Sequence, residues 1–513
     1  MAAVLSLWAA VLAGYGGLKA ISIRHDVLIT HALHFAWKQP FAYWPSDMQI
    51  TAALAALTGC IVFTMVFWLA FDTRWSGLSR DPASADAARA LLRKSAKTAP
   101  QLFAGRYAGK DFFVGPEDRG LVVGPPGTGK TAFLLNQVLR ASKQELSFIA
   151  IDIKPELHAI LYPSLAEADY RVIRINPALV DSDANHWNPL EDCTDETSLE
   201  ELCVALLPVR DAREAPFIES QRDWLKAAVY HAKATPGGSL PSAFEFLSAS
   251  PEPSQLLTAF MNSSSPQAAR LARRLAAGLA GQKPDPLILQ GLTGALRTLD
   301  FLCLPGVKSA LEHSDFSVRD IGRGARPTAL FLQFEEAKLG ALGPLLAFIT
   351  TAALTNLIDT AGHRKPVAMF LDELGNMPPI PGLLEKLNTI RSRRLPTWMY
   401  FQTTEQMNRR YGNNADAVFF ASADVQIFFR LNDAETRDLV SRLIGTTQKE
   451  RRSHSTTSGR TTLNVTKQRE NLIEPHELGM LKASEIVCLY RGNIARGYAS
   501  PFFRDFPQFN RTH

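Results

Sequence analysis

The octapeptide at residues 124–131 constrains the fold of this chain more than any other stretch. The apolar run 121–123 precedes it directly, which is typical of a short buried strand that turns tightly into a helix. The octapeptide fits the pattern G-x-x-x-x-G-K-[ST] with Gly124, Pro125, Pro126, Gly127, Thr128, Gly129, Lys130 and Thr131. The sequence therefore predicts an α/β fold in which this loop joins a strand to a helix.

The chemistry that this loop suits is phosphate binding. Its glycines let backbone N–H groups converge on phosphate oxygens, and the N-terminus of the next helix adds a partial positive charge. Lys130 is expected to reach the β- and γ-phosphates, and Thr131 to supply a hydroxyl group to Mg²⁺. The sequence thus predicts a site for a nucleoside triphosphate and Mg²⁺. A glycine-rich turn that matches by accident is the alternative.

Length and cysteine usage limit the class of protein. A chain of 513 residues is too long for one core, so two or three domains are expected. The five cysteines are scattered, without a C-x-x-C pair or histidines at metal-ligand spacing. This argues against a zinc site or a disulfide framework, and it suits a reducing cytosol.

Residues 50–71 are the first of two segments that could enter a membrane. They are 22 residues without a charged side chain, long enough to cross a bilayer as a helix. Trp44 stands before this run, and Trp68 and Trp75 lie near its far end, as interfacial anchors do. A buried globular helix is the alternative, but the length favours a transmembrane helix.

Residues 2–23 form the other apolar segment, interrupted only by Lys19. A cleaved signal peptide is the alternative, but no basic residue precedes Leu5. Because a second span follows closely, we predict an uncleaved transmembrane helix. The predicted transmembrane domain is therefore residues 1–72, with a short periplasmic loop, residues 24–49, between its helices.

The charges around these segments predict their orientation. Residues 24–49 hold two Lys or Arg against two Asp, whereas residues 72–110 hold eight basic side chains against three acidic ones. Because positive charge favours the cytoplasmic side, everything after residue 72 is expected in the cytoplasm. The sequence predicts a multi-pass membrane protein whose bulk is cytoplasmic.

The rest of the chain alternates apolar strands with helices. This alternation predicts a mainly parallel sheet that is covered on both faces. The predicted strands are residues 147–152, 171–175, 328–333, 366–371, 397–401, 425–431 and 486–490, with a long apolar helix at 342–359.

Residues 198–305 have a different pattern. Helical periodicity prevails there, as at 219–232 and 267–280, and no convincing strand is found. We therefore predict an all-α inserted domain at 198–305. It separates the first part of a nucleotide-binding domain, residues 73–197, from the second part, residues 306–513.

The pair Asp372 and Glu373 follows the predicted strand 366–371 directly. An acid at a strand end beside a phosphate loop holds Mg²⁺, directly or through water, and Asp372 is the candidate. Glu373 is placed to polarise the attacking water, which indicates hydrolysis. A solvated acidic turn is the alternative.

Two further residues are catalytic candidates. Gln402, at the end of the predicted strand 397–401, could sense the γ-phosphate or orient water. Arg391 lies in a basic cluster that could be a solvated turn. It could also reach the γ-phosphate of a neighbouring subunit, as in ring-shaped ATPases.

Several of these motifs occur together in the order of one family. The chain resembles the type IV secretion coupling proteins, the TraG/TrwB-type conjugation ATPases. The resemblance covers nearly the whole chain and rests on the two N-terminal spans, the phosphate loop, residues 151–156, 187–190 and 370–373, Arg391, Gln402, Gln406, Tyr411–Gly412 and 475–478.

Two departures from the family pattern are visible. The loop has Pro-Pro-Gly-Thr where the family more often has Thr-Gly-Ser, which leaves the phosphate contacts unaffected. The segment after Asp152 has Ile-Lys-Pro where Pro-Lys-Gly is commoner, and this weakens any role for Lys154.

The resemblance implies a RecA-like P-loop ATPase in the bacterial inner membrane that binds ATP and Mg²⁺. Such proteins form homo-hexamers, recruit relaxase-bound DNA, work with channel components and hydrolyse ATP in a DNA-stimulated way. The family's site would lie between two subunits and would contain Lys130, Thr131, Asp372, Glu373, Gln402 and Arg391.

The sequence itself says less about DNA. Residues 449–469 form a basic, Ser/Thr-rich segment that is predicted to be a loop. It could follow a phosphate backbone without reading sequence, on single- or double-stranded DNA, or it could be a solvated loop. Arg270, Arg273 and Arg274 are a second candidate patch.

Two hypotheses of different class remain. The first is an ATPase that moves DNA and its attached protein toward a secretion channel. The second is a membrane docking receptor for protein effectors, in which nucleotide binding is mainly structural. Lys130 and the Asp372–Glu373 pair favour turnover. An ABC-type transporter is a weaker third possibility, because no L-S-G-G-Q signature is present.

Overall fold

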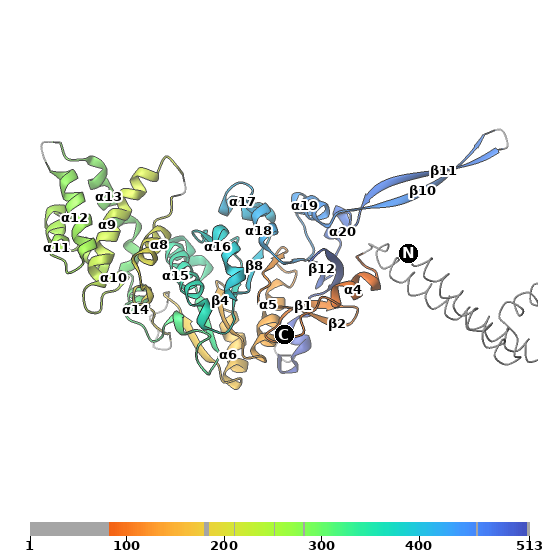
Figure 1. Cartoon of the computed structure of the whole chain (residues 1–513), viewed down its shortest axis with the longest axis horizontal. Coiled ribbons are helices and arrows are strands. Elements are labelled where there is room, and N and C mark those ends of the chain that lie inside the picture. Colours follow the sequence, from red (N-terminus) through yellow and green to blue (C-terminus); the bar gives the residue numbers. More distant parts are fainter. Residues whose placement is uncertain are drawn as a thin grey trace, which may run out of the picture. The chain divides into compact units, whose positions relative to one another are not determined.

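The structure is a computed structural model that describes residues 82–178, 184–209, 211–250, 252–280, 283–457 and 460–509 (Figure 1). The predicted transmembrane helices, residues 2–23 and 50–71, lie outside the described residues. From Pro82 onward the chain forms one compact unit, and an eleven-stranded sheet runs through it.

The strands of this sheet lie in the order β2-β1-β13-β12-β9-β3-β8-β7-β4-β6-β5. Their bounds are β1 Leu102–Tyr107, β2 Lys110–Val114, β3 Gly120–Val123, β4 Ser147–Asp152, β5 Arg171–Ile175, β6 Thr328–Gln333, β7 Val367–Leu371, β8 Thr397–Phe401, β9 Val425–Phe428, β12 Glu485–Tyr490 and β13 Asn493–Tyr498.

The strands from β9 to β5 all run parallel. Val122 of β3 lies opposite Tyr400 of β8 on one side and Ile427 of β9 on the other. The prediction of a mainly parallel sheet is confirmed.

The sheet is not parallel throughout, however. β12, β13, β1 and β2 extend it with antiparallel pairs, so the predicted strand 486–490 is antiparallel to its neighbours. The cause is local: Arg491 and Gly492 both have positive φ, and this two-residue turn reverses the chain between β12 and β13. The predicted strand 425–431 is also shorter, since β9 ends at Phe428.

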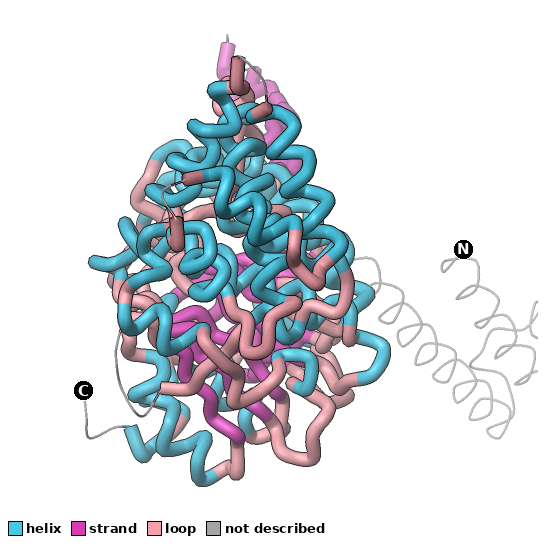
Figure 2. The backbone as a smooth tube through the Cα atoms, turned by 90° about the vertical axis from the view of Figure 1, so that its left-hand side faces the viewer, coloured by secondary structure: helices cyan, strands magenta, loops and turns pink. Residues whose placement is uncertain are grey.

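Both faces of the sheet are covered, and successive residues of the parallel strands enter different cores. In β6, Leu330 and Leu332 pack into one core, whereas Ala329 and Phe331 pack into the other. Figure 2 shows the strands in the interior with helices around them. The fully apolar strand sequences follow from this double burial.

Different helices cover the two faces. The apolar residues of α5 (Lys130–Ser142) and α6 (Leu157–Glu167) belong to the core that contains Phe331, and those of α15 (Leu339–Asp359) belong to the core that contains Leu330. Among the described residues, the other α-helices outside the region 196–311 are α4 Ala85–Leu92, α7 Pro189–Asp192, α16 Leu383–Ile390, α17 Thr404–Tyr411, α18 Ala415–Ser422, α19 Ala434–Ile444, α20 Pro475–Gly479 and α21 Phe502–Asp505.

Helix α15 is apolar for a reason that needs no membrane. Within the described residues, the segment Glu336–Asp359 is long and apolar enough to cross a bilayer, with a mean hydropathy of 1.7. In the structure, 78% of its most apolar window is buried inside the protein. It packs as a core helix of the α/β domain, as predicted for residues 342–359.

Between α7 and β6 the described chain contains helices and no strand. Figure 1 shows α9 to α13 gathered together. Proline stands in the first turn of each helix from α9 to α14, where its missing N–H group costs no hydrogen bond. The helices are α8 Glu196–Leu206, α9 Ala215–Lys233, α10 Leu240–Ser248, α11 Pro253–Met261, α12 Pro266–Leu279, α13 Pro286–Thr298 and α14 Pro305–Leu311.

One prediction about the C-terminal region is wrong. Residues 449–469 are not a loop, because β10 (Thr446–Thr457) and β11 (Arg460–Asn471) pair there as a separate antiparallel two-stranded sheet. Threonine and other β-formers recur through this segment. A separate two-stranded sheet can be solvated on both faces, so its strands can be polar. This polar composition is the reason why the sequence indicated a loop.

Candidate nucleotide-binding site

The phosphate loop lies between β3 and α5, in the middle of the parallel part of the sheet. Pro126 and Gly127 are exposed at its tip, while Thr128 is buried and its hydroxyl group donates to the carbonyl oxygen of Pro125 at 2.8 Å. The loop therefore closes on itself and presents its tip outward. Thr131, half-buried, lies in the first turn of α5.

Gly124 and Gly129 show why this loop needs glycine. Gly129 precedes α5 with φ of +103°, a left-handed conformation that side chains rarely adopt. At Gly124 an added Cβ atom would lie 2.7 Å from the Cβ atom of Phe429, so a side chain does not fit. Phe429 follows β9 and packs beneath the loop, a contact that no sequence motif indicated.

Lys130 points back over the loop. Its side chain is buried, with 4% exposed, and its Nζ atom donates to the carbonyl oxygens of Gly124 and, at 3.3 Å, Pro125. Burial lowers the pKa of Lys130, while the nearby charges of Glu373 and Asp372 oppose that change. The three side chains therefore form one electrostatic cluster.

Asp372 and Glu373 follow β7, which is separated from β3 only by β8. Because these strands are parallel, the acids meet the phosphate loop at the same edge of the sheet, the carboxyl edge. Asp372 is 6% exposed, and burial followed by repulsion from Glu373 raises its pKa to about 7. Its Oδ1 atom accepts a hydrogen bond from the backbone N–H group of Glu373 at 3.1 Å.

Glu373 is held on both carboxylate oxygens. Lys154 donates to Oε1 at 3.2 Å, and the side-chain amide of Gln402 donates to Oε2 at 2.8 Å. Burial alone would raise the pKa of Glu373, but the hydrogen bond from Gln402 and the charges of Lys130 and Lys154 lower it below its ordinary value. Glu373 also has a positive φ of +50°. Its carboxylate is thus buried, ionised and fixed in direction.

Lys154 and a pair of amides complete this edge. The departure from the family pattern around Lys154 had weakened the case for a role of this residue. In the structure, however, its ammonium group donates to Glu373. Gln406 accepts a hydrogen bond from the backbone N–H group of Gln402 and donates to Asn376, which follows the acidic pair by three residues. Gln406 belonged to the family pattern, whereas Asn376 carried no signal of its own.

Arg391 lies elsewhere. It stands in the short turn Arg391–Arg393 before β8, at the amino edge of the sheet, opposite the phosphate loop. Its side chain is 58% exposed, and its Nη2 atom lies 3.9 Å from Oδ1 of Asp424. The structure brings Lys130, Asp372, Glu373 and Gln402 together and leaves Arg391 apart from them in the same chain.

An open, mainly parallel sheet carries a phosphate loop and a buried acidic pair at one edge. These features define the class of P-loop nucleotide-binding folds. Residues 83–500 match the model of the family described as Type IV secretory system Conjugative DNA transfer, and the chain belongs to that family.

Individual relatives agree with this. The chain is 22% identical over 402 residues to Protein VirD4 of Agrobacterium fabrum, which covers 76% of this chain and 59% of VirD4. It is 29% identical over 224 residues to the conjugal transfer protein TraG of the same organism, which covers 41% of this chain and 33% of TraG. The chain therefore spans less than two thirds of the length of these relatives.

A solved structure shares the fold. The plasmid coupling protein TrwB, in complex with ADP and Mg²⁺, superimposes with a TM-score of 0.64 at 18% identity. The superposition covers 80% of this chain and 92% of the TrwB chain. The chain thus shares the α/β fold of TrwB, with its mainly parallel sheet.

Proposed function

We propose that this chain is a P-loop ATPase that binds ATP and Mg²⁺ and uses hydrolysis to move DNA toward a type IV secretion channel. The buried cluster of Lys130, Asp372 and Glu373 carries this proposal. A fixed, ionised carboxylate beside the phosphate loop serves turnover of a bound nucleotide. Family membership and the likeness to TrwB, solved with ADP and Mg²⁺, support the choice of nucleotide and metal.

The residues of the loop fit a triphosphate with its metal ion. Helix α5 begins without a side-chain cap, so the N–H groups of its first turn are suited to phosphate oxygens. The Nζ atom of Lys130 donates to carbonyl oxygens of its own loop, and it can exchange these contacts for the β- and γ-phosphates. The Thr131 hydroxyl and the Asp372 carboxylate are the oxygen ligands that Mg²⁺ prefers. When bound, Mg²⁺ supplies neutralising charge to the phosphate oxygens.

The catalytic roles follow from the same contacts. Glu373 would accept a proton from the attacking water, and its lowered pKa keeps it ionised near neutral pH. Gln402 would hold that carboxylate in direction. Arg391 would act in trans, on the γ-phosphate bound by a neighbouring subunit, where a positive charge stabilises the transition state.

The domain organisation and assembly are part of the proposal. Residues 1–72 would anchor the chain in the bacterial inner membrane by helices 2–23 and 50–71, with the loop 24–49 in the periplasm. Residues 73–197 and 306–513 would form the cytoplasmic nucleotide-binding domain, and 198–305 the all-α inserted domain. A homo-hexamer would place Arg391 of one subunit beside the phosphate loop of the next. Relaxase-bound DNA and channel components would be its partners.

DNA would be bound without reading its sequence. The ribbon of β10 and β11 is rich in Lys and Arg in its sequence, which suits contact with a phosphate backbone. The second candidate patch, on α12, is partly engaged already, because Arg274 pairs with Asp223 of α9. The ribbon is therefore the better candidate.

The decisive experiment measures ATP hydrolysis by the purified full-length chain, with and without single-stranded DNA. Lys130→Ala should abolish hydrolysis, and DNA transfer with it. Membrane insertion should persist, since the loop lies far along the chain from residues 1–72. Lys110→Ala, an exposed lysine of β2, is the matched control and should hydrolyse ATP like the parent.

Normal DNA transfer by Lys130→Ala would contradict the ATPase proposal. It would favour the docking receptor, in which nucleotide serves only to hold the assembly together. DNA transfer that is lost together with hydrolysis, while Lys110→Ala retains both, would support a translocating ATPase.

A further inference from the structure

The chain passes between the sheet and the helical region twice, and the two passages run side by side. The incoming segment is residues 184–189, and the outgoing segment is residues 309–318. The backbone N–H group of Trp187 donates to the carbonyl oxygen of Ala310 at 2.8 Å, and that of Asp315 donates to the carbonyl oxygen of His186 at 3.0 Å. These passages form the neck of the helical region.

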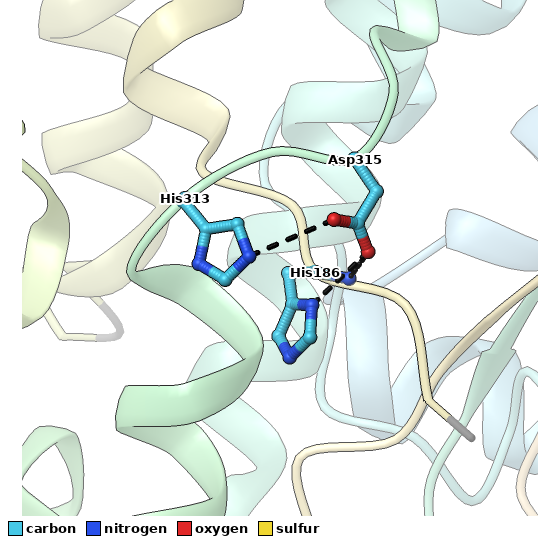
Figure 3. Close-up of side chains that lie close together, drawn as sticks. All are labelled: His186, His313 and Asp315. Carbon is cyan, nitrogen blue, oxygen red and sulfur yellow. Dashed lines mark hydrogen bonds and ion pairs between the residues drawn. The ribbon is translucent and has the colours of Figure 1, made fainter. Parts of the chain in front are cut away.

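Two histidines and an aspartate gather at this neck (Figure 3). Nδ1 of His186 lies 3.0 Å from Oδ2 of Asp315, and Nε2 of His313 lies 3.6 Å from Oδ1 of the same carboxylate. One potential ligand atom from each residue lies within 4.8 Å of the others. His186 comes from the incoming segment, and the other two come from the outgoing one.

This donor set and spacing suit a tetrahedral zinc ion. Zinc binds imidazole nitrogen and carboxylate oxygen at about 2.0–2.2 Å, which places neighbouring tetrahedral ligand atoms about 3.3 Å apart. The separations of 3.0 and 3.6 Å lie on either side of that value. The two nitrogens face different oxygens of the Asp315 carboxylate, so rotation of the side chains would bring one oxygen and both nitrogens onto one ion. The fourth position would be left for water.

The surroundings hold two of the ligands in place. The backbone N–H group of His186 donates to Oδ2 of Asp315 at 2.9 Å, which fixes the carboxylate. Nε2 of His186 faces the hydroxyl group of Ser309 at 3.5 Å, the kind of outer partner that orients a metal-bound histidine.

The site is also accessible. The side chains of His186, Asp315 and His313 are 25%, 38% and 58% exposed. The two imidazole rings stack with centroids 4.3 Å apart, so His313 already lies over His186. An ion can enter from solvent without opening the core.

We propose that His186, His313 and Asp315 bind one Zn²⁺ ion, which joins the two passages of the neck. Zinc is favoured over Mg²⁺ because two of the three ligands are imidazole nitrogens, and Mg²⁺ prefers oxygen. The site is distinct from the phosphate loop and does not depend on the proposed ATPase activity. A metal-free cluster of hydrogen bonds is the competing outcome.

Zinc content tests this directly. The full-length chain is purified in detergent without a polyhistidine tag or nucleotide, equilibrated with Zn²⁺ and passed over a desalting column, and bound metal is measured by mass spectrometry. The parent should retain one zinc ion per chain. His313→Ala should weaken zinc binding by more than tenfold, because loss of an outer partner alone costs about 10–100-fold. His363→Ala, an exposed histidine away from the neck, should bind zinc like the parent.

A spectroscopic measurement covers the case in which a variant folds poorly. Co²⁺ in a tetrahedral site with nitrogen ligands gives intense visible bands, which the parent should show and Asp315→Asn should lose. Equal zinc content in the parent and His313→Ala would place any zinc elsewhere and overturn the proposal. So would a parent that retains no zinc and shows no Co²⁺ bands.

Discussion

The two edges of the central sheet differ in how their charges are satisfied. At the carboxyl edge, Lys130, Asp372 and Glu373 are all less than a tenth exposed and act on one another. At the amino edge, Asp424 is bound at 3.0 Å by Arg119, which is itself buried. Arg391 has only the more distant contact of 3.9 Å with that same carboxylate.

This difference indicates how a complete ATPase site could form between two subunits. The carboxyl edge is organised within a single chain, since each acid has its partners there. The amino edge offers an exposed guanidinium whose local ion pair is long and screened by solvent. If copies of the chain packed edge to edge, the Arg391 guanidinium of one copy would lie beside the Lys130, Asp372 and Glu373 cluster of the next. The comparison predicts that mutations at the two edges have different consequences in mixed assemblies.

The largest effect is expected from Arg391→Ala. An arginine that reaches a neighbouring γ-phosphate contributes about 10³–10⁵-fold to the rate, so kcat should fall by that order while nucleotide binding persists. Arg393→Ala, in the same exposed turn, is the matched control and should stay near the parent rate. ATPase assays of both variants at saturating ATP give the comparison.

Mixing experiments sharpen this prediction. Subunits with Arg391→Ala retain an intact carboxyl edge, and subunits with Glu373→Gln retain an intact amino edge. Mixed assemblies should therefore recover part of the activity that each variant lacks alone. No recovery in mixed assemblies of confirmed composition would argue that the two edges do not cooperate between subunits.

Glu373→Gln is expected to have the next largest effect. The substitution keeps the shape but removes the base, which should lower kcat by about 10²–10⁴-fold. ATP binding, measured by fluorescence titration, should remain. Glu385→Gln, on the exposed side of α16, is the control. A Glu373→Gln variant with the parent rate would remove Glu373 from the chemistry.

Asp372→Asn tests the cost of a buried acid through stability. The folded pKa of Asp372, about 7, lies above its usual value, so the folded state binds the proton more tightly than the unfolded chain. Stability from this group is therefore full at low pH and is lost as pH rises toward 7. The neutral amide avoids that loss and should stabilise the nucleotide-free, Mg²⁺-free protein at pH 8 by a few kcal/mol, on the order that the shift implies.

Thermal unfolding at several pH values checks this. The gain in Tm of Asp372→Asn over the parent should grow from acidic pH to neutral pH and then level off. Asp438→Asn, an exposed residue of α19, should show no such trend. A gain that is constant across pH would mean that the pKa of Asp372 is the same in the folded and unfolded states.

Several features of the sheet and of its carboxyl edge could be predicted from the sequence. The buried strands β4, β6 and β8 have the predicted bounds, because double burial leaves a nearly unbroken apolar run. The edge strand β5 also has the predicted bounds, although it contains two arginines. The family is confirmed, and the residues of the carboxyl edge are close in space because parallel strands bring their ends together. The roles of Lys130, Asp372, Glu373 and Gln402 remain proposals.

Other features left no readable pattern. β1, β2 and β13 lie at the antiparallel end of the sheet, with polar side chains among their apolar ones, and were not predicted. The ribbon of β10 and β11 was predicted to be a loop because its composition is polar. His186 and His313 are far apart in the sequence, so a search for ligands at short spacing could not pair them.

Gln402→Ala should give the smallest effect and the finest test of the carboxyl edge. Its amide donates to Glu373 at 2.8 Å, and this contact helps to lower the pKa of Glu373. Without it, the pKa of Glu373 should rise, and the base should be protonated at a higher pH than in the parent. The acidic limb of the pH–rate profile should therefore move to higher pH, with a loss of about tenfold in kcat near neutral pH, as expected for one hydrogen bond to a charged group. The side chain of Gln406 contacts the backbone of Gln402 and not Glu373. The variant Gln406→Ala therefore leaves the contact between Gln402 and Glu373 in place, and its pH–rate profile should keep the parent midpoint. An unmoved acidic limb in Gln402→Ala would mean that Glu373 does not set the pH dependence of hydrolysis.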